Sequence, residues 1–267
     1  MLIDSHTHIG CIDYKVGKNK VFTLAGEDLI AAMKKYSVDY ALVSSIEGAE
    51  FDSDGRLAPV DKQVPQLQSF KNLLQFIRNN GDSLKALLWI KPYTEKTTAA
   101  LEEFITENRK YIAGFKMHPS LSRMKFTDER FSPYLDLASD LKMPVQVHTE
   151  NDGFSNVEYA GMIAGRYPNT DFVMVHMGLG SDNSEAMGLI RESGNIYGDT
   201  CEVKPGNVIS AIEECGSQKI LFGTDAVVHG IDTYVRYLPL IELIRKTFSK
   251  EEADNVLFSN CRRVFNV

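Results

Sequence analysis

Short apolar runs alternate along this chain of 267 residues with longer segments in which apolar residues recur three and four positions apart. The eight apolar runs cover residues 2–9, 40–46, 84–90, 112–118, 144–148, 171–177, 195–201 and 219–225. The amphipathic segments that follow them cover residues 27–36, 64–79, 98–111, 131–141, 156–167, 183–193, 205–215 and 231–248. Strict alternation of strands and helices predicts a parallel sheet, because parallel strands need crossover connections.

Residues that commonly begin helices or form turns fall at the expected boundaries between the predicted helices and strands. Pro65 and Pro205 fall at expected helix starts, and Gly81 and Gly194 fall in turns before strands. No linker, repeat or low-complexity tract divides the chain. Eight such units predict an α/β fold, a single (β/α)8 TIM barrel domain over residues 1–267. A doubly wound open sheet is the alternative, since the number of strands alone does not exclude it.

Five of the six histidines stand at the carboxyl ends of the apolar runs. His6 and His8 close the first run, His118 the fourth, His148 the fifth and His176 the sixth. In a parallel barrel these ends meet at one mouth, where barrel enzymes build their active sites. We therefore expect residues that are far apart in the sequence to lie close together there.

Three of these histidines and one aspartate have the pattern of a metal site. His6 and His8 share one face of a strand, because side chains two positions apart point the same way. His148 ends the fifth run and Asp225 ends the eighth. Three or four nitrogen and oxygen ligands with an open position are typical of a catalytic zinc centre. The four cysteines form no CxxC pair, so a thiolate site is not expected.

Each part of this pattern also has an ordinary structural explanation. A histidine pair in a strand is a weak signal by itself, and an aspartate at a strand end often caps the next helix. Asp4 either orients a ligand or satisfies backbone groups, and Asp199 either contacts substrate or caps a loop. The joint occurrence of such residues at the same end of the first, fifth, sixth and eighth runs favours a metal site.

Several segments resemble the metal-dependent amidohydrolase superfamily, and most closely its amidohydrolase-2 branch of TIM-barrel hydrolases and decarboxylases. These segments are IDSHTH at residues 3–8, GFKMHP at 114–119, VHT at 147–149, VHMG at 175–178, LFGTDA at 221–226 and NVLFSNCRRVF at 255–265. Together they extend over almost the whole chain, and their order and context carry the resemblance more than any one motif does.

The resemblance implies a role for each matching residue. His6, His8, His148 and Asp225 match the metal ligands, and Asp225 also handles the proton of the metal-bound water. His176 matches a histidine that binds a second metal in binuclear members and contacts or protonates substrate in mononuclear ones. Independently of the resemblance, a divalent ion lowers the pKa of bound water to about 7, which supplies hydroxide at neutral pH.

Lys116 and His118 share a strand face at the end of the fourth run. In binuclear members of the superfamily a lysine at this position is carbamylated and bridges two metals. The amidohydrolase-2 branch often carries the same motif with a single metal. Lys116 and His118 would then contact an anionic substrate group or hold the barrel mouth together, and Lys116, His118 and His176 are the residues predicted to bind substrate. Pairing of Lys116 with an acidic neighbour is the ordinary alternative. One divalent ion is favoured, with zinc preferred and manganese, iron or cobalt as alternatives.

The first functional prediction is a metal-dependent hydrolase of a small-molecule amide, ester or lactone. The alternative is a metal-dependent nonoxidative decarboxylase of a small carboxylic acid, since the branch contains both; this chain lacks the length for the mouth insertions of many decarboxylases. A barrel that binds metal or ligand without turnover is the third interpretation, because a fold alone does not establish function. Lys15, Lys18 and Lys20 fit either an anionic substrate or a solvated loop.

Composition limits the partners of the chain. The formal net charge of −7 at pH 7, from 36 acidic and 29 basic residues, argues against nucleic acid or an anionic membrane as the main partner. No apolar run approaches the about 20 residues that cross a bilayer. The N-terminal MLIDSHTHIG lacks the features of a signal peptide. We therefore expect a cytoplasmic enzyme with a small-molecule substrate, and a homodimer is left open.

Overall fold

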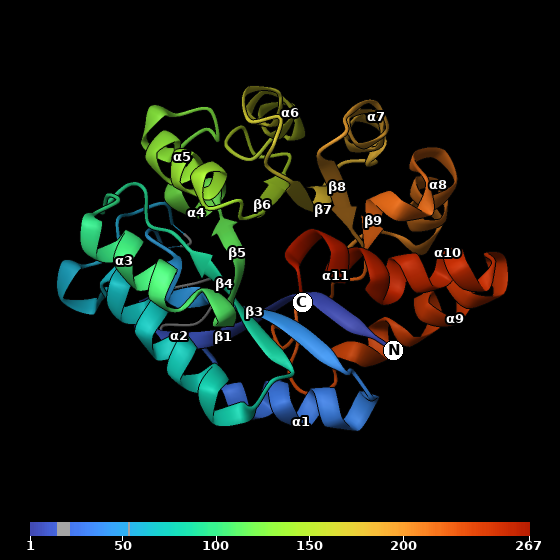
Figure 1. Cartoon of the computed structure of the whole chain (residues 1–267), viewed down its shortest axis with the longest axis horizontal. Helices are drawn as coiled ribbons and strands as arrows, with labels where there is room; N and C mark the ends of the chain where they lie inside the picture. Colours follow the sequence, from blue (N-terminus) through green and yellow to red (C-terminus); the bar gives the residue numbers. More distant parts are fainter. Residues whose placement is uncertain (15–21, 53) are drawn as a thin grey trace.

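The strands form one curled sheet in which the parallel strands follow one another in sequence order (Figure 1). The computed structural model describes residues 1–14, 22–52 and 54–267, so the prediction about Lys15, Lys18 and Lys20 lies outside the described residues. The parallel strands are β1 (Ile3–Ile12), β3 (Tyr40–Ser45), β4 (Leu84–Trp89), β5 (Ile112–Met117), β6 (Val145–Glu150), β7 (Phe172–Leu179), β8 (Ile196–Asp199) and β9 (Ile220–Leu221). A short strand, β2 (Phe22–Leu24), pairs antiparallel with the end of β1.

Helices connect consecutive strands on the outside of the sheet, as the parallel order requires. They are α1 (Gly26–Tyr36), α2 (Gln66–Asn80), α3 (Ala99–Glu107), α4 (Pro119–Ser122), α5 (Ser132–Asp140), α6 (Val157–Arg166), α7 (Ser184–Glu192) and α8 (Pro205–Cys215). Three more helices follow the last strand, namely α9 (Leu238–Thr247), α10 (Lys250–Asp254) and α11 (Asn260–Phe265). Most overlap the predicted amphipathic segments. The last predicted segment begins later than expected, because Thr233–Arg236 forms a separate 3-10 turn and Pro239 suits the first turn of a new helix. Among the described helices, none is long and apolar enough to cross a membrane.

The segment after β9 joins the last strand to the first. The backbone N–H of Ser5 donates to the carbonyl oxygen of Phe222 over 2.9 Å, and that of His8 donates to Ala226 over 2.6 Å. In return, the N–H of Asp225 donates to the carbonyl oxygen of His6 over 2.9 Å. The order of the parallel strands, from β1 to β9, runs without reversal, so they have no switch point of the doubly wound kind. The predicted α/β fold of the barrel type is therefore confirmed as a curled sheet, with a final strand shorter than the predicted run.

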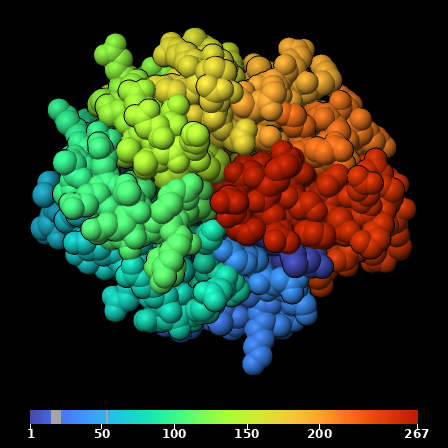
Figure 2. Space-filling model, viewed as in Figure 1, coloured from blue at the N-terminus to red at the C-terminus, as the bar shows by residue number. Residues whose placement is uncertain are grey.

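The amino end of the barrel is filled by apolar side chains and covered by the C-terminal helix. Inward residues of the strands meet side chains of α11 in one buried cluster, formed by Ile3, Leu42, Leu87, Ala113, Val173, Tyr197, Leu221, Cys261, Val264 and Phe265. Figure 2 shows the C-terminal segment, in red, over the middle of this face. The polar residues at the strand ends consequently face the opposite, carboxyl end.

Candidate functional site

Three candidate ligand atoms meet at the carboxyl end of the barrel. The Nε2 atoms of His6 and His8, both on β1, lie 3.0 Å apart. Asp225, which follows β9, places Oδ1 2.9 Å from Nε2 of His8 and 3.4 Å from Nε2 of His6. Both rings are buried, whereas the Asp225 side chain is 20% exposed. Among the described residues, these three form one of two groups whose atoms are close enough to hold a metal ion.

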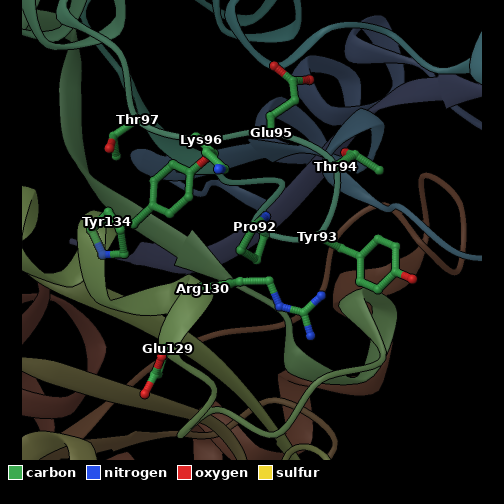
Figure 3. A pocket seen from close by; sticks show the side chains of 10 residues that line it. Pro92, Tyr93, Thr94, Glu95, Lys96, Thr97, Glu129, Arg130 and Tyr134 are labelled. Atoms are coloured by element: carbon green, nitrogen blue, oxygen red, sulfur yellow. The ribbon is translucent and has the colours of Figure 1, made fainter.

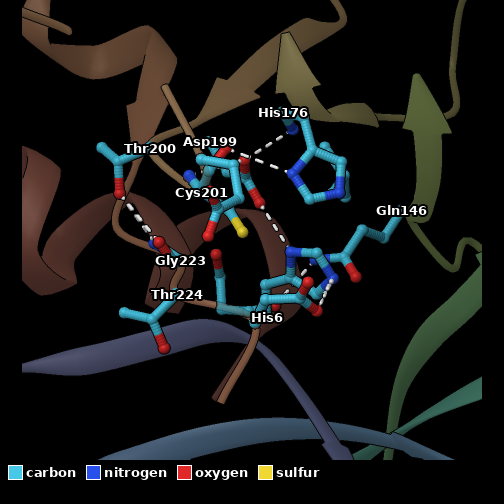
Figure 4. A network of polar contacts seen from close by, with 12 residues as sticks. His6, Gln146, His176, Asp199, Thr200, Cys201, Gly223 and Thr224 are labelled. Atoms are coloured by element: carbon cyan, nitrogen blue, oxygen red, sulfur yellow. Dashed lines mark hydrogen bonds and ion pairs between the residues drawn. The ribbon is translucent and has the colours of Figure 1, made fainter. Parts of the chain in front are cut away.

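The other ring nitrogens of the two histidines have partners of their own. His6 Nδ1 lies 3.1 Å from Oδ2 of Asp199, a contact drawn as a dashed line in Figure 4, and His8 Nδ1 lies 2.8 Å from Oγ of Ser44. Burial raises the pKa of Asp199 to about 7, against the opposing influence of Lys116 and of the backbone N–H groups of His176 and Cys201. The ionised carboxylate only accepts hydrogen bonds, so in that state His6 Nδ1 carries a hydrogen and Nε2 presents a lone pair. Partners of this kind fix the orientation of ligating rings in metal centres. The Nε2 atoms are thus the ones left for a cation.

The donor set suits a divalent ion in charge and in spacing. Burial, and then the Lys116 ammonium, lowers the pKa of His6 well below its usual 6.5, so this imidazole stays neutral. Two nitrogens bound to one Zn²⁺ at about 2.1 Å in tetrahedral geometry lie about 3.4 Å apart. The 3.0 Å between the Nε2 atoms of His6 and His8 is close to that value. Two imidazoles and a carboxylate are also ligands that first-row metals accept.

Lys116 reaches this cluster from β5. Its buried Nζ donates to Nε2 of His6 over 3.1 Å and to Oε1 of Gln146 over 3.3 Å. Burial lowers the pKa of Lys116 to about 8, against the opposing influence of Asp225 and Asp199. The described hydrogen-bond partners of Nζ are therefore an imidazole and an amide rather than a carboxylate.

His148 lies beside the three-residue group and not within it. Its Nε2 lies 3.1 Å from Oε2 of Glu150, so this nitrogen is directed to a carboxylate. Its ring stacks on the ring of His118, whose Nδ1 accepts the backbone N–H of Leu121 over 3.2 Å. The nitrogen of His148 that is left for a ligand is Nδ1. Its role as a metal ligand stays a prediction.

His176 has a backbone conformation that periodicity could not predict. Its φ of 67° lies in the left-handed region. Residues other than glycine rarely adopt this conformation, and those that do are concentrated at functional sites. Its Nδ1 lies 3.2 Å from the carbonyl oxygen of Cys201. Since that oxygen only accepts, Nδ1 carries the hydrogen and Nε2 presents a lone pair. Burial, and then His148, lowers the pKa of His176 to about 3. His176, Cys201 and His6 form the second group of atoms that could hold a metal.

A cavity of about 140 Å³ opens over these groups. The residues predicted for the site that line it are His6, His8, Lys116, His118, His148, His176 and Asp225. Apolar side chains complete the lining, namely Phe22, Ile46, Trp89, Leu121 and Val228. The structure thus brings every predicted site residue to one cavity, whose lining contains both polar and apolar groups.

A second pocket, of about 370 Å³, lies between the loop after β4 and the start of α5 (Figure 3). The Arg130 guanidinium lies there 5.0 Å from the centroid of the Tyr93 ring and is already paired with Asp128. Residues predicted for the metal or substrate do not line this pocket. The candidate chemistry therefore belongs to the smaller cavity.

Sequence analysis missed or undervalued several polar residues around the ligands. Gln146 stands two positions before His148, so strand alternation could have placed it on the same face. Ser44 lies near the carboxyl end of the second run, so its position could likewise have placed it near the site. Asp4 accepts hydrogen bonds from the His6 backbone and from a threonine hydroxyl, and so it satisfies local groups. Asp199 faces His6, which neither of its two predicted roles included.

The fold and the cavity define a class of (β/α)8 barrels with a cluster of histidine and carboxylate groups at the mouth. A family model described as amidohydrolase matches residues 3–267. The chain therefore belongs to the amidohydrolase family, and the resemblance to the amidohydrolase-2 branch is confirmed. That family contains hydrolases as well as decarboxylases. No curated protein matches the chain.

Solved structures with the same fold cover nearly the whole chain at low identity. An amidohydrolase from Burkholderia multivorans with bound zinc has a TM-score of 0.72 and 14% identity, covering 100% of this chain and 99% of its own. A probable 2-pyrone-4,6-dicarboxylic acid hydrolase from Acinetobacter baumannii with bound citric acid has a TM-score of 0.64 and 14% identity, with coverages of 100% and 99%. A 5-carboxyvanillate decarboxylase from Novosphingobium aromaticivorans with manganese has a TM-score of 0.66 and 13% identity, with coverages of 91% and 80%.

Proposed function

We propose that the chain is a metal-dependent hydrolase that acts on a small-molecule amide, ester or lactone. In this proposal His6, His8 and Asp225 hold one divalent ion, and His148 completes the ligand set from β6. Zinc is the first choice, with manganese, iron and cobalt as alternatives, because imidazole and carboxylate ligands accept all four. The zinc-bound and manganese-bound neighbours support a divalent ion of this kind.

The position of Asp225 carries the proposal. A bound divalent ion supplies electrophilic activation of a carbonyl oxygen and a lower pKa for water. The Asp225 carboxylate lies next to both Nε2 atoms and lines the cavity, so it can take a proton from a water and return it to the leaving group. His118 is held with Nδ1 as an acceptor, so its Nε2–H can donate to a substrate oxygen. Lys116 and His176 complete the proposed substrate contacts.

A nonoxidative decarboxylase is the second candidate, and the apolar part of the cavity wall favours it. Phe22, Ile46, Trp89, Leu121 and Val228 line the same cavity as the polar groups and would lower the polarity around a bound substrate. A carboxylate loses stability in such surroundings, whereas the neutral carbon dioxide that it releases does not. The same residues therefore support either reaction, and product analysis distinguishes the two.

The test is turnover by the protein loaded with Zn²⁺ or Mn²⁺, measured on a panel of amides, esters, lactones and aryl carboxylates. We expect Asp225→Asn to lower the rate about 10²–10⁴-fold, because it removes the proton acceptor. Metal content is measured in each variant, so that loss of metal is distinguished from loss of proton transfer. Asp61→Asn, at an exposed position, is the matched control and should leave the rate unchanged.

Each result decides between the candidates. Hydrolysis products that depend on Asp225 support the proposed hydrolase. Release of carbon dioxide instead establishes the decarboxylase. A protein that binds metal and turns over no member of the panel supports the third interpretation, a binding barrel without catalysis.

A further inference from the structure

Asp199 is a fully buried carboxylate behind the ligand cluster, at the end of β8 (Figure 4). Its two oxygens have separate partners. Oδ1 accepts the backbone N–H of His176 over 2.9 Å and that of Cys201 over 3.1 Å. Oδ2 lies 3.1 Å from Nδ1 of His6. One side chain therefore connects the ends of β7 and β8 to a ring on β1.

Gly223 provides the space for this contact. A Cβ atom at this glycine would lie 2.8 Å from Oδ2 of Asp199 and 3.0 Å from Cβ of His6, which is closer than side chains tolerate. The segment that leads to Asp225 can pass beside the Asp199–His6 pair because it has no side chain at this point. The pair is thus packed between strands. The loop cap that the sequence offered for Asp199 is also present, because its other oxygen accepts the N–H of Cys201 two residues further on.

We propose that Asp199 is a positioning residue that fixes the His6 ring as its Nδ1–H tautomer and so keeps His6 Nε2 available to the divalent ion. This inference rests on the proposed function, in which His6 is a metal ligand. Because an ionised carboxylate has no hydrogen to offer, His6 Nδ1 donates whenever Asp199 is ionised. Nε2 then carries the lone pair, and this is the atom that lies 3.0 Å from Nε2 of His8.

The same carboxylate also supports His176. The backbone of His176 is held at a φ of 67°, a conformation that persists where the surroundings impose it. The bond from its N–H to Asp199 is one such restraint, and the bond from Cys201 N–H to the same oxygen holds the carboxylate in place. Asp199 therefore orients two residues that line the cavity. It contacts the ring of His6 directly, and it holds His176 through the backbone N–H.

Asp199→Asn keeps the shape of the side chain and reverses one of its contacts. The amide oxygen must stay at the position of Oδ1, since the N–H groups of His176 and Cys201 need an acceptor there. The NH₂ group then faces Nδ1 of His6 and donates to it, which moves the ring hydrogen to Nε2. That nitrogen is the proposed ligand atom. Asp199→Ala, in contrast, removes the acceptor without imposing the other tautomer.

The test compares Zn²⁺ affinity and stability in these two variants. Affinity is measured by competition with a chromophoric chelator, and stability by urea denaturation of the metal-free protein. We expect Asp199→Asn to weaken Zn²⁺ binding about 10–100-fold and more than Asp199→Ala does. We expect Asp199→Ala to be the less stable variant, because it leaves two buried N–H groups unpaired. Equal affinities, or tighter binding by Asp199→Asn than by Asp199→Ala, overturn the proposal.

Nitrogen-15 spectra of the histidine side chains in metal-free protein give a second readout. The His6 signals are assigned by their loss in His6→Ala. We expect the Nδ1–H tautomer in the unmodified protein and Nε2–H in Asp199→Asn, and an unchanged tautomer overturns the proposal. Ser44→Ala is the control, since it removes the partner of His8 Nδ1 and should leave the His6 tautomer unchanged. Absence of metal binding in the unmodified protein would refute the proposed function, and the tautomer would still test the role of Asp199.

Discussion

The imidazole rings of His118 and His148 stack face to face, with centroids 3.8 Å apart and planes inclined by 13°. Trp89 in turn stacks on His118, at 5.1 Å and 12°. Gly48 lies against Trp89, where an added Cβ would be 2.2 Å from its Cγ. The ends of β4, β5 and β6 and the turn after β3 are therefore packed into one wall of the cavity. This packing fixes the plane of His148 and leaves its Nδ1 as the nitrogen for a ligand.

His6→Ala and His148→Ala are expected to lose metal to different extents. His6 supplies one of three converging atoms, so its removal should leave little bound metal after dialysis. His148 lies at the edge of the group and has Nε2 paired with Glu150, so His148→Ala should weaken binding less. Elemental analysis per protomer measures both. Full metal occupancy in His6→Ala would contradict the assignment of His6, His8 and Asp225 as the metal-binding group. Full metal occupancy in His148→Ala would show that His148 is not a required ligand. His229→Ala, at a side chain 45% exposed, is the control and should keep its metal.

Gly48→Ala should destabilise the protein and disturb the stacked wall. The new methyl group overlaps Trp89, and overpacking of this kind costs about 1–3 kcal/mol. Trp89 is the single tryptophan of the chain, so its fluorescence reports on the wall directly. Gly188→Ala, within α7 and with no atom within 4 Å of the added carbon, should instead gain about 0.5–1 kcal/mol. Equal stabilities of the two variants in urea denaturation would contradict close packing of Gly48 against Trp89.

The barrel and the convergence of the site could be predicted because both follow from local periodicity. Alternation of apolar runs and amphipathic segments determines the strand order, and the spacing of His6 and His8 places both on one face. The short strand β2 carried no such signal, since three residues show no period. The last strand was predicted too long for a related reason: residues 222–226 bond to β1 outside a regular ladder.

The orientation of side chains in the site could not be predicted, because it depends on contacts between distant strands. Neither the turn of His148 towards Glu150 nor the pairing of Asp199 with His6 has a local signature. The positive φ angles of His176 and Asp225 likewise arise from the surrounding packing. The single-domain organisation, a cytoplasmic location, the small-molecule substrate and a homodimer stay predictions.

Glu50 should make stability depend on pH. This buried carboxylate accepts hydrogen bonds from the N–H and hydroxyl of Thr94 and from the hydroxyl of Ser122, and so it ties together loops that follow β3, β4 and β5. Burial raises the pKa of Glu50 above its usual 4.5, only partly offset by these bonds. The folded protein then binds more protons at Glu50 than the unfolded chain does, so stability falls as the pH rises from 4.5 through the folded pKa.

Glu50→Gln removes this titration and isolates its effect. The free energy of unfolding of the unmodified protein minus that of the variant should decrease as the pH rises from 4.5 through the folded pKa of Glu50, and then stay level. Urea denaturation of both proteins at a series of pH values measures the difference. A difference that grows with pH would show that the hydrogen bonds outweigh burial and lower the pKa of Glu50 overall.

Phe265→Ala should separate the stability of the barrel from the chemistry at its mouth. Phe265, from α11, is buried among inward residues of the strands at the amino end, and removal of such a side chain costs about 3–5 kcal/mol. The proposed ligands lie at the opposite end, where barrel enzymes carry function while the amino end carries stability. The folded variant should therefore bind metal with unchanged stoichiometry, whereas Arg262→Ala, exposed on the same helix, should alter stability by less than about 0.5 kcal/mol. Loss of metal from the folded Phe265→Ala protein would show that the two ends of the barrel are coupled.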